Sequence, residues 1–303
     1  MFTSSFSLNA ELNSIKDSAG SRKSKIDAVV KLGLPYTEAL ALVSSWPVQA
    51  TGTRADSFVT TFGVEIETVH CPASSFVAAA AAFGLDVMDH THSYWGCHAD
   101  VPRYKIVPDS SICGASPAEC VTPALKSTNA GFKSLEACCK ALSQVGATVN
   151  RSCGLHVHIG AADLTEEQYV NVFENYRRLE TAIDSFMALS RKGDNSRWCR
   201  TIRSFNFNSC RTRRAVDRMM GDRYFKVNPE SWTRHQTIEF RQHAGTTNFT
   251  KIKNWVKFLV KLVGWSRTHR LDRDINCIED IPFLTASEKR YFAGRRDALT
   301  SAA

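Results

Sequence analysis

Hydrophobic and polar residues alternate over several short stretches of the chain, as expected for strands that bury one face. The first stretch is Phe58–Val69, and an alanine-rich helical pattern follows over Ser74–Phe83. The other predicted strands are Leu85–Asp89, Tyr104–Val107, Glu119–Thr122, Ala147–Asn150, Leu155–Ile159, Phe225–Asn228 and Gln236–Gln242. The other predicted helices are Leu135–Val145, Thr165–Ser190, Asn248–His269 and Ser287–Leu299. Strands with helices between them indicate an α+β domain with a mostly antiparallel sheet.

The first 55 residues differ from the rest. Two short amphipathic stretches, Lys25–Leu32 and Thr37–Ser45, flank a Gly33-Leu34-Pro35 break that ends the first of them. This pattern predicts a small helical appendage over residues 1–55, followed by a catalytic domain over residues 56–303. A DNA-binding helix–turn–helix is the alternative interpretation of the helical pair.

Composition places the chain among ordinary globular proteins, with 43% hydrophobic and 22% charged residues in a length of 303. No apolar run is long enough to span a membrane, and the Ser/Asn-rich start does not have the pattern of a signal peptide. Ten cysteines include no CxxC pair, which argues against a zinc ribbon. We therefore expect reduced thiols, mostly in the core, and a cytoplasmic location.

Positive charge is concentrated in one segment. Residues 191–226 contain eleven lysines and arginines against three aspartates, so this segment carries the same excess charge as the whole chain, +8. Such a segment predicts an anionic partner, which could be a nucleotide triphosphate, a nucleic acid or an acidic peptide. A solvated basic face is the alternative.

Charged side chains stand at alternate positions on strands that are otherwise apolar. In Phe62-Gly63-Val64-Glu65-Ile66-Glu67 the two glutamates share one face, roughly 6–7 Å apart along the strand. Two carboxylates on a covered face repel each other, and a divalent cation such as Mg²⁺ relieves that repulsion. An exposed edge strand with two solvated glutamates is the alternative.

Two later strands repeat this arrangement. His156 and His158 share a face in Gly154–Gly160, and Glu239 and Arg241 share a face in Thr237–Arg241. Imidazole can bind a metal or donate to a phosphate, and the planar fork of arginine suits phosphate oxygens. Glu119 adds a carboxylate at the start of another strand. Together these strands predict one sheet face that holds divalent cations and a polyphosphate, without a P-loop or a GxGxxG motif.

The ordered motifs FGVEIE, VPDSSI, AECVTPAL, NRSCGLHVHIG, RYFKVN and TIEFRQHAGTTN resemble those of the amidoligase family. The resemblance runs from about Phe62 to about Trp265. That family is similar to glutamine synthetase and glutamate–cysteine ligase in fold. The resemblance therefore implies a glutamine-synthetase-like curved sheet, mostly antiparallel, with helices packed on its convex face.

The resemblance also implies roles for individual residues. The metal ligands it implies are Glu65, Glu67, Glu119, His156 and Glu239. His158 would contact phosphate, Arg241 would hold the transferred phosphoryl group, and Asp109 would contact the substrate amine or remove its proton. In this chain Ser110 stands where the family commonly has glycine after that aspartate. The residues expected to face the nucleotide or an anionic substrate are Arg241, His158, Arg223, Asn228, Arg200 and Arg203.

The expected reaction is the ATP-dependent joining of a carboxylate to an amine through an acyl-phosphate. ATP and two or three Mg²⁺ ions are the expected cofactors, with Mn²⁺ as a substitute. Two other functions compete with this one. HxH after a strand also occurs in metal-dependent amidohydrolases, and the basic segment 191–226 with nearby aromatic residues fits a protein that binds or modifies nucleic acid.

Overall fold

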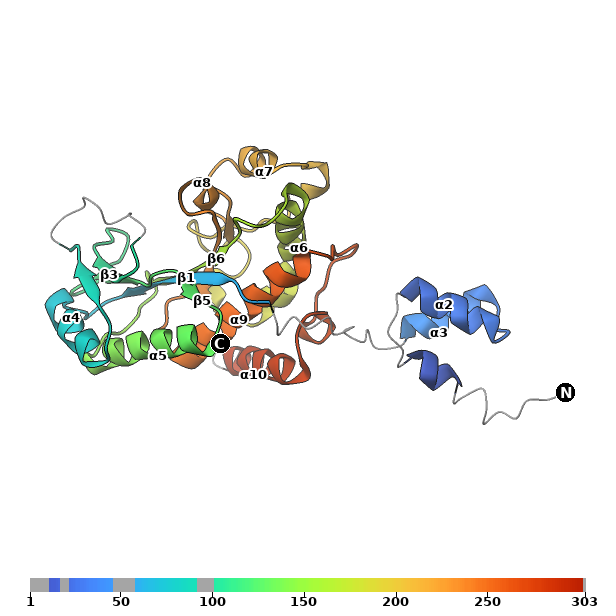
Figure 1. Ribbon diagram of the computed structural model, residues 1–303, viewed down its shortest axis with the longest axis horizontal. Helices are drawn as coiled ribbons and strands as arrows, with labels where there is room; N and C mark the ends of the chain where they lie inside the picture. Colours follow the sequence, from blue (N-terminus) through green and yellow to red (C-terminus); the bar gives the residue numbers. More distant parts are fainter. Residues whose placement is uncertain (1–10, 17–21, 46–57, 92–100, 302–303) are drawn as a thin grey trace. The chain divides into compact units, whose positions relative to one another are not determined.

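The computed structural model describes residues 11–16, 22–45, 58–91 and 101–301 (Figure 1). The chain divides into two compact units, Met1–Arg54 and Ala55–Ala303. The predicted domain boundary at residues 55 and 56 lies outside the described residues. Within them, no helix is both long enough and apolar enough to cross a membrane.

The first unit contains a helix at residues 11–16 and the helices α2 (Arg22–Lys31) and α3 (Tyr36–Ser45). Gly33 ends the α2 segment with a positive φ of 99°, a conformation that glycine adopts without strain. The helical pair predicted from the sequence is therefore present. Its small core consists of Ile26, Val29, Ala39 and Val43.

The second unit is built on one sheet. The strands are β1 (Thr61–Thr68), β2 (Val87–Asp89), β3 (Tyr104–Val107), β4 (Ala118–Val121), β5 (Leu125–Lys126), β6 (Gly154–Gly160), β7 (Val227–Asn228) and β8 (Thr237–Ala244). Their order is β2-β3-β4-β1-β6-β8-β7, and β5 also pairs with β1. All pairings are antiparallel except β2 with β3, so the sheet is mixed. The predicted α+β class is thus confirmed, while likeness to glutamine synthetase stays a prediction.

The helices of this unit are α4 (Ala73–Ala82), α5 (Asn129–Gln144), α6 (Glu166–Ser185), α7 (Arg213–Met220), α8 (Ser231–His235), α9 (Phe249–Ser266) and α10 (Ala286–Ser301). Short 3-10 turns are η2 (Leu189–Arg191), η3 (Phe207–Ser209) and η4 (Ile278–Asp280). Figure 1 shows α4, α5, α9 and α10 on one side of the sheet and α7 and α8 on the other. Long helices therefore cover one face of the sheet, and the short helices α7 and α8 lie on the side of the other face.

Alternation along the strands decides which face is closed. On β1, Phe62, Val64 and Ile66 are buried in the main core, and on β6 Leu155, Val157 and Ile159 are buried with them. Burying a side chain of this size contributes roughly 1.5–3 kcal/mol, which fixes the register of each strand. The intervening glutamates and histidines therefore point away from the core.

Helix ends follow the local signals in part. Thr165 caps α6, and Gln168 completes a reciprocal capping box with it. The helix ends at Ser185, earlier than the predicted Ser190. The predicted strand Ala147–Asn150 was wrong, since only Thr148 forms a bridge there, with Val69. Strand β5 was not predicted, because two residues carry no periodic signal.

The described cysteines are all free, as expected from the sequence. Seven of them are buried, whereas Cys113 and Cys277 are exposed. The Cys120 and Cys138 sulfur atoms lie 3.4 Å apart in the core, at hydrogen-bond distance and without a disulfide between them.

Candidate active site

Four strands bring the predicted acidic and imidazole side chains to the same sheet face. Glu65 on β1 lies opposite His156 on β6, and Glu67 lies opposite Glu119 on β4. His158 in turn lies opposite Glu239 on β8. Side chains directly opposite in an antiparallel pair are close neighbours. The sheet therefore collects groups that are up to 174 positions apart in the chain, between Glu65 and Glu239.

The closest group is Glu65, His156 and Glu239. One ligand atom from each lies within 4.8 Å of the other two, a spacing that could hold a metal ion. The His156 Nδ1 atom is 3.1 Å from Glu65 Oε2 and 3.6 Å from Glu239 Oε1. Around them, His158 Nε2 lies 3.2 Å from Glu65 Oε1, and Glu67 Oε1 lies 3.5 Å from His156 Nε2.

Negative charge is in excess in this cluster, and the pKa values of its members diverge. Burial would raise the pKa of Glu65, but the His158 charge and hydrogen bonds from His156 and His158 hold it well below its ordinary value. Burial raises the pKa of Glu119 well above its ordinary value, and the charges of Glu65, Glu67 and Asp109 raise it further. A bound cation would relieve this repulsion.

His158 and Glu239 are shifted toward their charged forms. Burial favours neutral His158, yet the Glu65 carboxylate outweighs burial and raises the His158 pKa. Burial would raise the pKa of Glu239, but Arg241 and His158 outweigh it and lower that pKa. Divergent pKa values in a cluster that lines a cavity are typical of functional sites.

Contacts from surrounding groups hold the cluster in place. The Gly154 backbone N–H donates to Glu67 Oε2 at 2.6 Å, and Asn228 Nδ2 donates to Glu239 Oε2 at 2.5 Å. Thr237 Oγ1 lies 2.9 Å from His158 Nδ1. These contacts orient the ligand atoms in the way that outer hydrogen bonds orient metal ligands.

A β-bulge lies beside this cluster. Between the Phe240–Val157 and His243–Leu155 pairs, β8 has one more residue than β6. Arg241 lies in this bulge and lines the polar cavity, where its Nη1 donates to Glu239 Oε1. Gln242 is fully buried and turns toward α6, where it bonds Asp184. The bulge thus aims two adjacent side chains at different parts of the molecule.

Two adjoining cavities open onto the cluster. The polar one, of about 360 Å³, contains Glu65, Glu67, Glu119, His156, His158, Glu239, Arg241, Asp109, Asn228 and Arg223 among its lining residues. The second, of about 600 Å³, is lined mainly by apolar residues such as Val107 and Val121. Glu65, Glu119 and His158 line both. The structure therefore brings ten of the twelve predicted site residues to one cavity.

Arg200 and Arg203 are the two that line neither cavity. Arg200 pairs with Asp222 at 2.5 Å and stacks over the Phe225 ring at 4.0 Å. Arg203 lies 3.5 Å from an Asp184 oxygen. The geometry places both guanidinium groups in ion pairs, Arg200 with Asp222 of the same segment and Arg203 with Asp184 of α6.

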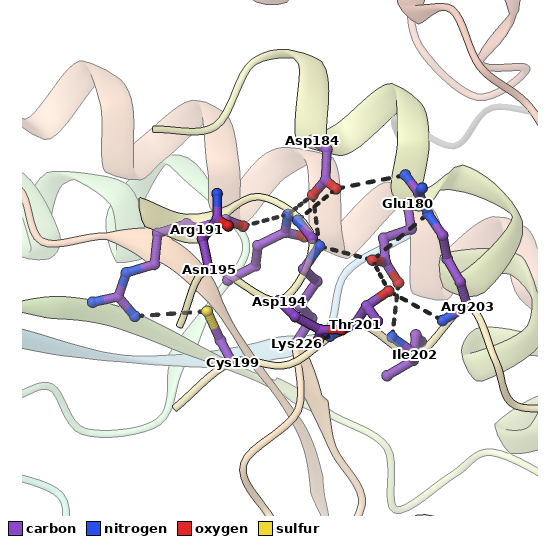
Figure 2. Close-up of polar contacts among 12 residues, drawn as sticks. Glu180, Asp184, Arg191, Asp194, Asn195, Cys199, Thr201, Ile202, Arg203 and Lys226 are labelled. Carbon is purple, nitrogen blue, oxygen red and sulfur yellow. Dashed lines mark hydrogen bonds and ion pairs between the residues drawn. The ribbon is translucent and has the colours of Figure 1, made fainter. Parts of the chain in front are cut away.

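Much of the charge in segment 191–226 is neutralised in the same way. Arg213 pairs with Glu166, and Lys226 Nζ lies 2.7 Å from both Glu180 and Asp184 (Figure 2). Lys226 is fully buried, so it is not available to a nucleic acid. The simple count of positive charges therefore overstates how basic the surface of this segment is.

Asp109 lies in a turn at the mouth of the polar cavity. Its Oδ1 accepts from the Ser111 backbone N–H at 2.7 Å. Among the described non-glycine residues only His70, Ser116 and Gln236 have a positive φ. Ser110 therefore does not occupy a conformation that requires glycine, which explains how serine is accommodated at this position.

Sequence reasoning missed several residues that line the two cavities. Lys105 is 7% exposed and lines the larger cavity, whereas Arg191, Trp198, Tyr224 and Arg234 line the polar one. Lys105 stands on the same face of β3 as the glutamates of β1, as its pairing with Val121 implies. Alternation on β3 could have revealed it, but no sequence signal marks the loop residues Arg191 and Trp198.

The donor set fits a hard divalent cation. Carboxylate oxygens are the ligands that Mg²⁺ prefers, and one imidazole among them is compatible with Mg²⁺ or Mn²⁺. The crowding that raises the Glu119 pKa is the second observation that favours a cation here. Fold and site together define the class: an α+β domain whose open sheet face carries a carboxylate–imidazole cluster with arginine beside it.

Within that class, residues 59–263 match the family described as "Putative amidoligase enzyme", and this chain belongs to that family. The predicted family resemblance is thus confirmed, and with it a ligase activity at the coarse level. The match ends before α10 and does not include the first unit. No curated protein sequence matches the chain.

Proposed function

We propose that the unit Ala55–Ala303 is an ATP- and Mg²⁺-dependent ligase that joins a carboxylate to an amine through an acyl-phosphate. The observation that carries this proposal is the convergence of four strands on one cavity, with membership in the amidoligase family as its support. A carboxylate is a poor electrophile, and transfer of a phosphoryl group converts it into an acyl-phosphate with a good leaving group. The amine then displaces phosphate and forms the amide bond.

The carboxylates and His156 would hold the metal ions. The proposed ligands are Glu65, Glu67, Glu119, His156 and Glu239. Bound Mg²⁺ supplies neutralisation of the nucleotide phosphates and of charge that develops on the transferred group. The hydrogen bonds from Gly154 and Asn228 keep the carboxylate oxygens of Glu67 and Glu239 in position before metal ions bind.

Arg241 and His158 would stabilise the transferred phosphoryl group. Arg241 is buried and lies against Glu239, so its fork is oriented before the ligand binds. The Glu65 charge raises the pKa of His158, which favours the imidazolium that donates to an anionic oxygen. Groups that are oriented in advance lower the barrier more than mobile ones do.

Asp109 would take the proton from the attacking amine. It lines the same cavity as the metal ligands, and its charge reaches Glu119. Arg223 and Asn228 line the cavity wall and would face the nucleotide or the acid substrate. The predicted contribution of Arg200 and Arg203 to nucleotide binding is not part of this proposal, because other residues hold them in ion pairs.

The experiment that tests the function measures Mg²⁺-dependent nucleotide binding and then ADP release. The full chain is titrated with Mg–ATP in a calorimeter, next to a Glu65→Gln variant and a Glu136→Gln control. Glu136 forms an exposed pair with Lys140 on α5. We expect binding by the wild type and the control and at least a tenfold loss in the variant.

ADP release is then screened with pairs of carboxylic acids and amines. Stimulation that needs both partners supports ligation, while release that needs neither indicates a simple hydrolase. A wild-type chain that takes up no Mg–ATP would remove the proposal. Zinc retained through purification, with activity in the absence of nucleotide, would favour the amidohydrolase alternative.

A further inference from the structure

Arg191 is a buried cation beside the candidate active site. It is the last residue of η2, it is 6% exposed, and it lines the polar cavity. Its Nη2 atom donates to the Cys153 carbonyl oxygen at 2.8 Å. Figure 2 shows its other contact, in which Nη1 lies 3.9 Å from the Cys199 sulfur. Neither partner carries a negative charge. No ion pair between Arg191 and a carboxylate is found in the described part of the chain.

This environment sets Arg191 apart from the other buried cations near it. Arg241 has Glu239 as its counter-ion, and Lys226 has Glu180 and Asp184. Burial of a charged group costs several kcal/mol unless an opposite charge offsets it. A buried arginine that lines a cavity without such a partner therefore points to an anion supplied by a ligand.

The position of Arg191 relative to the metal cluster follows from Gly154. A side-chain carbon built at Gly154 would lie 2.9 Å from His156 Nε2, 3.4 Å from Arg191 Nη2 and 3.4 Å from Glu67 Oε1. These three groups therefore surround one point beside the strand. The arginine fork lies on the His156 and Glu67 side of the cluster, whereas Arg241 lies on the Glu239 side.

We propose that Arg191 binds an anionic group of the ligand in the polar cavity. The group is either a phosphoryl oxygen of the nucleotide or a carboxylate of the acid substrate, since both suit the guanidinium fork. The proposal rests on the proposed function for the identity of the ligand, but not for the existence of an anion site. It adds a second buried arginine to the site, on the side of His156 away from Arg241.

A network of buried hydrogen bonds holds the backbone of Arg191 in place. Gln242 Nε2 donates to the Arg191 carbonyl oxygen at 3.2 Å and also to Asp184. Asp184 accepts from the Gly193 backbone N–H at 3.0 Å and from Lys226 Nζ at 2.7 Å. Figure 2 shows Asp184 at the centre of these contacts. Gln242 is thus a positioning residue, which acts through the backbone of η2.

The test compares Arg191→Met and Arg191→Lys with a matched control, Lys192→Met. Lys192 is the adjacent cation, it is half-buried, and it lines neither cavity. The probes are Mg–ADP, inorganic phosphate and malonate, and their dissociation constants are measured by calorimetry. Arg191→Met should weaken at least one probe about 10- to 100-fold, the range for a lost hydrogen bond to a charged group. Arg191→Lys should restore part of the loss, and Lys192→Met should change nothing.

The three probes separate the two sources of the anion. Weaker binding of Mg–ADP and phosphate assigns Arg191 to the nucleotide, and weaker binding of malonate alone assigns it to the acid substrate. Unchanged binding of every probe in Arg191→Met overturns the proposal. So does a wild-type chain that binds none of the three, or an equal loss in Lys192→Met.

The failure of the ligase proposal gives a different result. A wild-type chain that binds malonate through Arg191 but takes up no Mg–ADP removes the nucleotide-dependent function and leaves the anion site.

Gln242→Met tests the positioning role, since it keeps side-chain volume and removes the contact to Arg191. It should weaken the same probe several-fold and add nothing to Arg191→Met in the double variant. Additive losses would contradict a role through Arg191.

Discussion

Two clusters of charged side chains in the unit Ala55–Ala303 contain the same residue types but have different roles. The Glu65 cluster lines two cavities and holds four glutamates, with the buried Arg241 on one side of it and the buried Arg191 on the other. The cluster around Lys226 is packed against α6, where Glu180 and Asp184 face Lys226 and Arg203. In the second cluster the charges balance, and its hydrogen bonds join buried partners.

The difference between the clusters distinguishes a ligand-binding site from a charge cluster that stabilises the fold. In the Glu65 cluster, burial and the neighbouring carboxylates raise the Glu119 pKa, whereas His158 and His156 lower the Glu65 pKa, and a ligand cation would supply the missing positive charge. In the Lys226 cluster the counter-charges are supplied by the protein itself. Excess charge of one sign beside a cavity, rather than the number of charges, therefore identifies the site.

The largest effect is expected when the balanced cluster is broken. Lys226→Met leaves Glu180 and Asp184 without their fully buried cation, and the free energy of unfolding should fall by about 3–5 kcal/mol. Urea unfolding followed by tryptophan fluorescence measures this. A loss below about 1 kcal/mol would mean that the cluster does not support the fold.

Breaking the unbalanced cluster should affect the reaction more than the fold. Arg241→Ala should reduce turnover by about 10²–10³, or roughly 3–4 kcal/mol of barrier, because one oriented donor is lost. ADP release measures the effect, and the circular dichroism spectrum should not change. Arg273→Ala, which removes an exposed arginine, is the control. Equal rates in Arg241→Ala and the wild type would remove Arg241 from the mechanism.

A third prediction concerns a buried group that belongs to neither cluster. Burial lowers the pKa of His243 from 6.5 to about 3. The folded chain keeps His243 neutral, so its contribution to stability is complete above pH 6.5 and declines as the pH falls from 6.5 toward 3. Between pH 7 and pH 5 the loss should be about 2 kcal/mol.

Urea unfolding at both pH values measures this loss, and His243→Phe is the comparison, since it keeps a ring beside Trp255. The variant should lose about 2 kcal/mol less than the wild type over the same interval. Parallel pH profiles for the two chains would show that His243 is not responsible.

The smallest effect is expected for an exposed pair. Lys140→Met removes the contact with Glu136, whose nitrogen and oxygen atoms lie 3.0 Å apart on the surface of α5. The free energy of unfolding should change by less than about 0.5 kcal/mol. A change in the free energy of unfolding as large as that of Lys226→Met would contradict the distinction between buried and exposed ion pairs.

The sequence predicted much of the sheet because alternation is a local property. The pairs Glu65/Glu67, His156/His158 and Glu239/Arg241 lie on the predicted common face, since each pair sits on one strand and needs only the two-residue period. The convergence of these strands was inferred from their repeated polar pairs, and the pairing of β1 with β4 and β6 agrees with it.

Features that depend on tertiary contacts could not be read from the sequence. Arg200 and Arg203 were expected at the nucleotide, but the fold pairs them with Asp222 and with Asp184 of α6 instead. The bulge at Arg241 and Gln242 breaks the two-residue period beyond Arg241, without a local signal such as glycine. Arg191 lies at the cavity because residues distant in the chain hold its backbone there, as Gln242 does.

The placement of β1 at the centre of the sheet has a consequence for biosynthesis. The first carboxylates of the cluster are made with residues 61–68, but their partners on β6 and β8 emerge only by Gly160 and Ala244. Pairings between segments so far apart in the chain form late, because long loops must close first. A ribosome-bound chain that stops before Glu239 thus lacks one ligand of the proposed cation site. Competence for chemistry therefore arises only after β8 has been made.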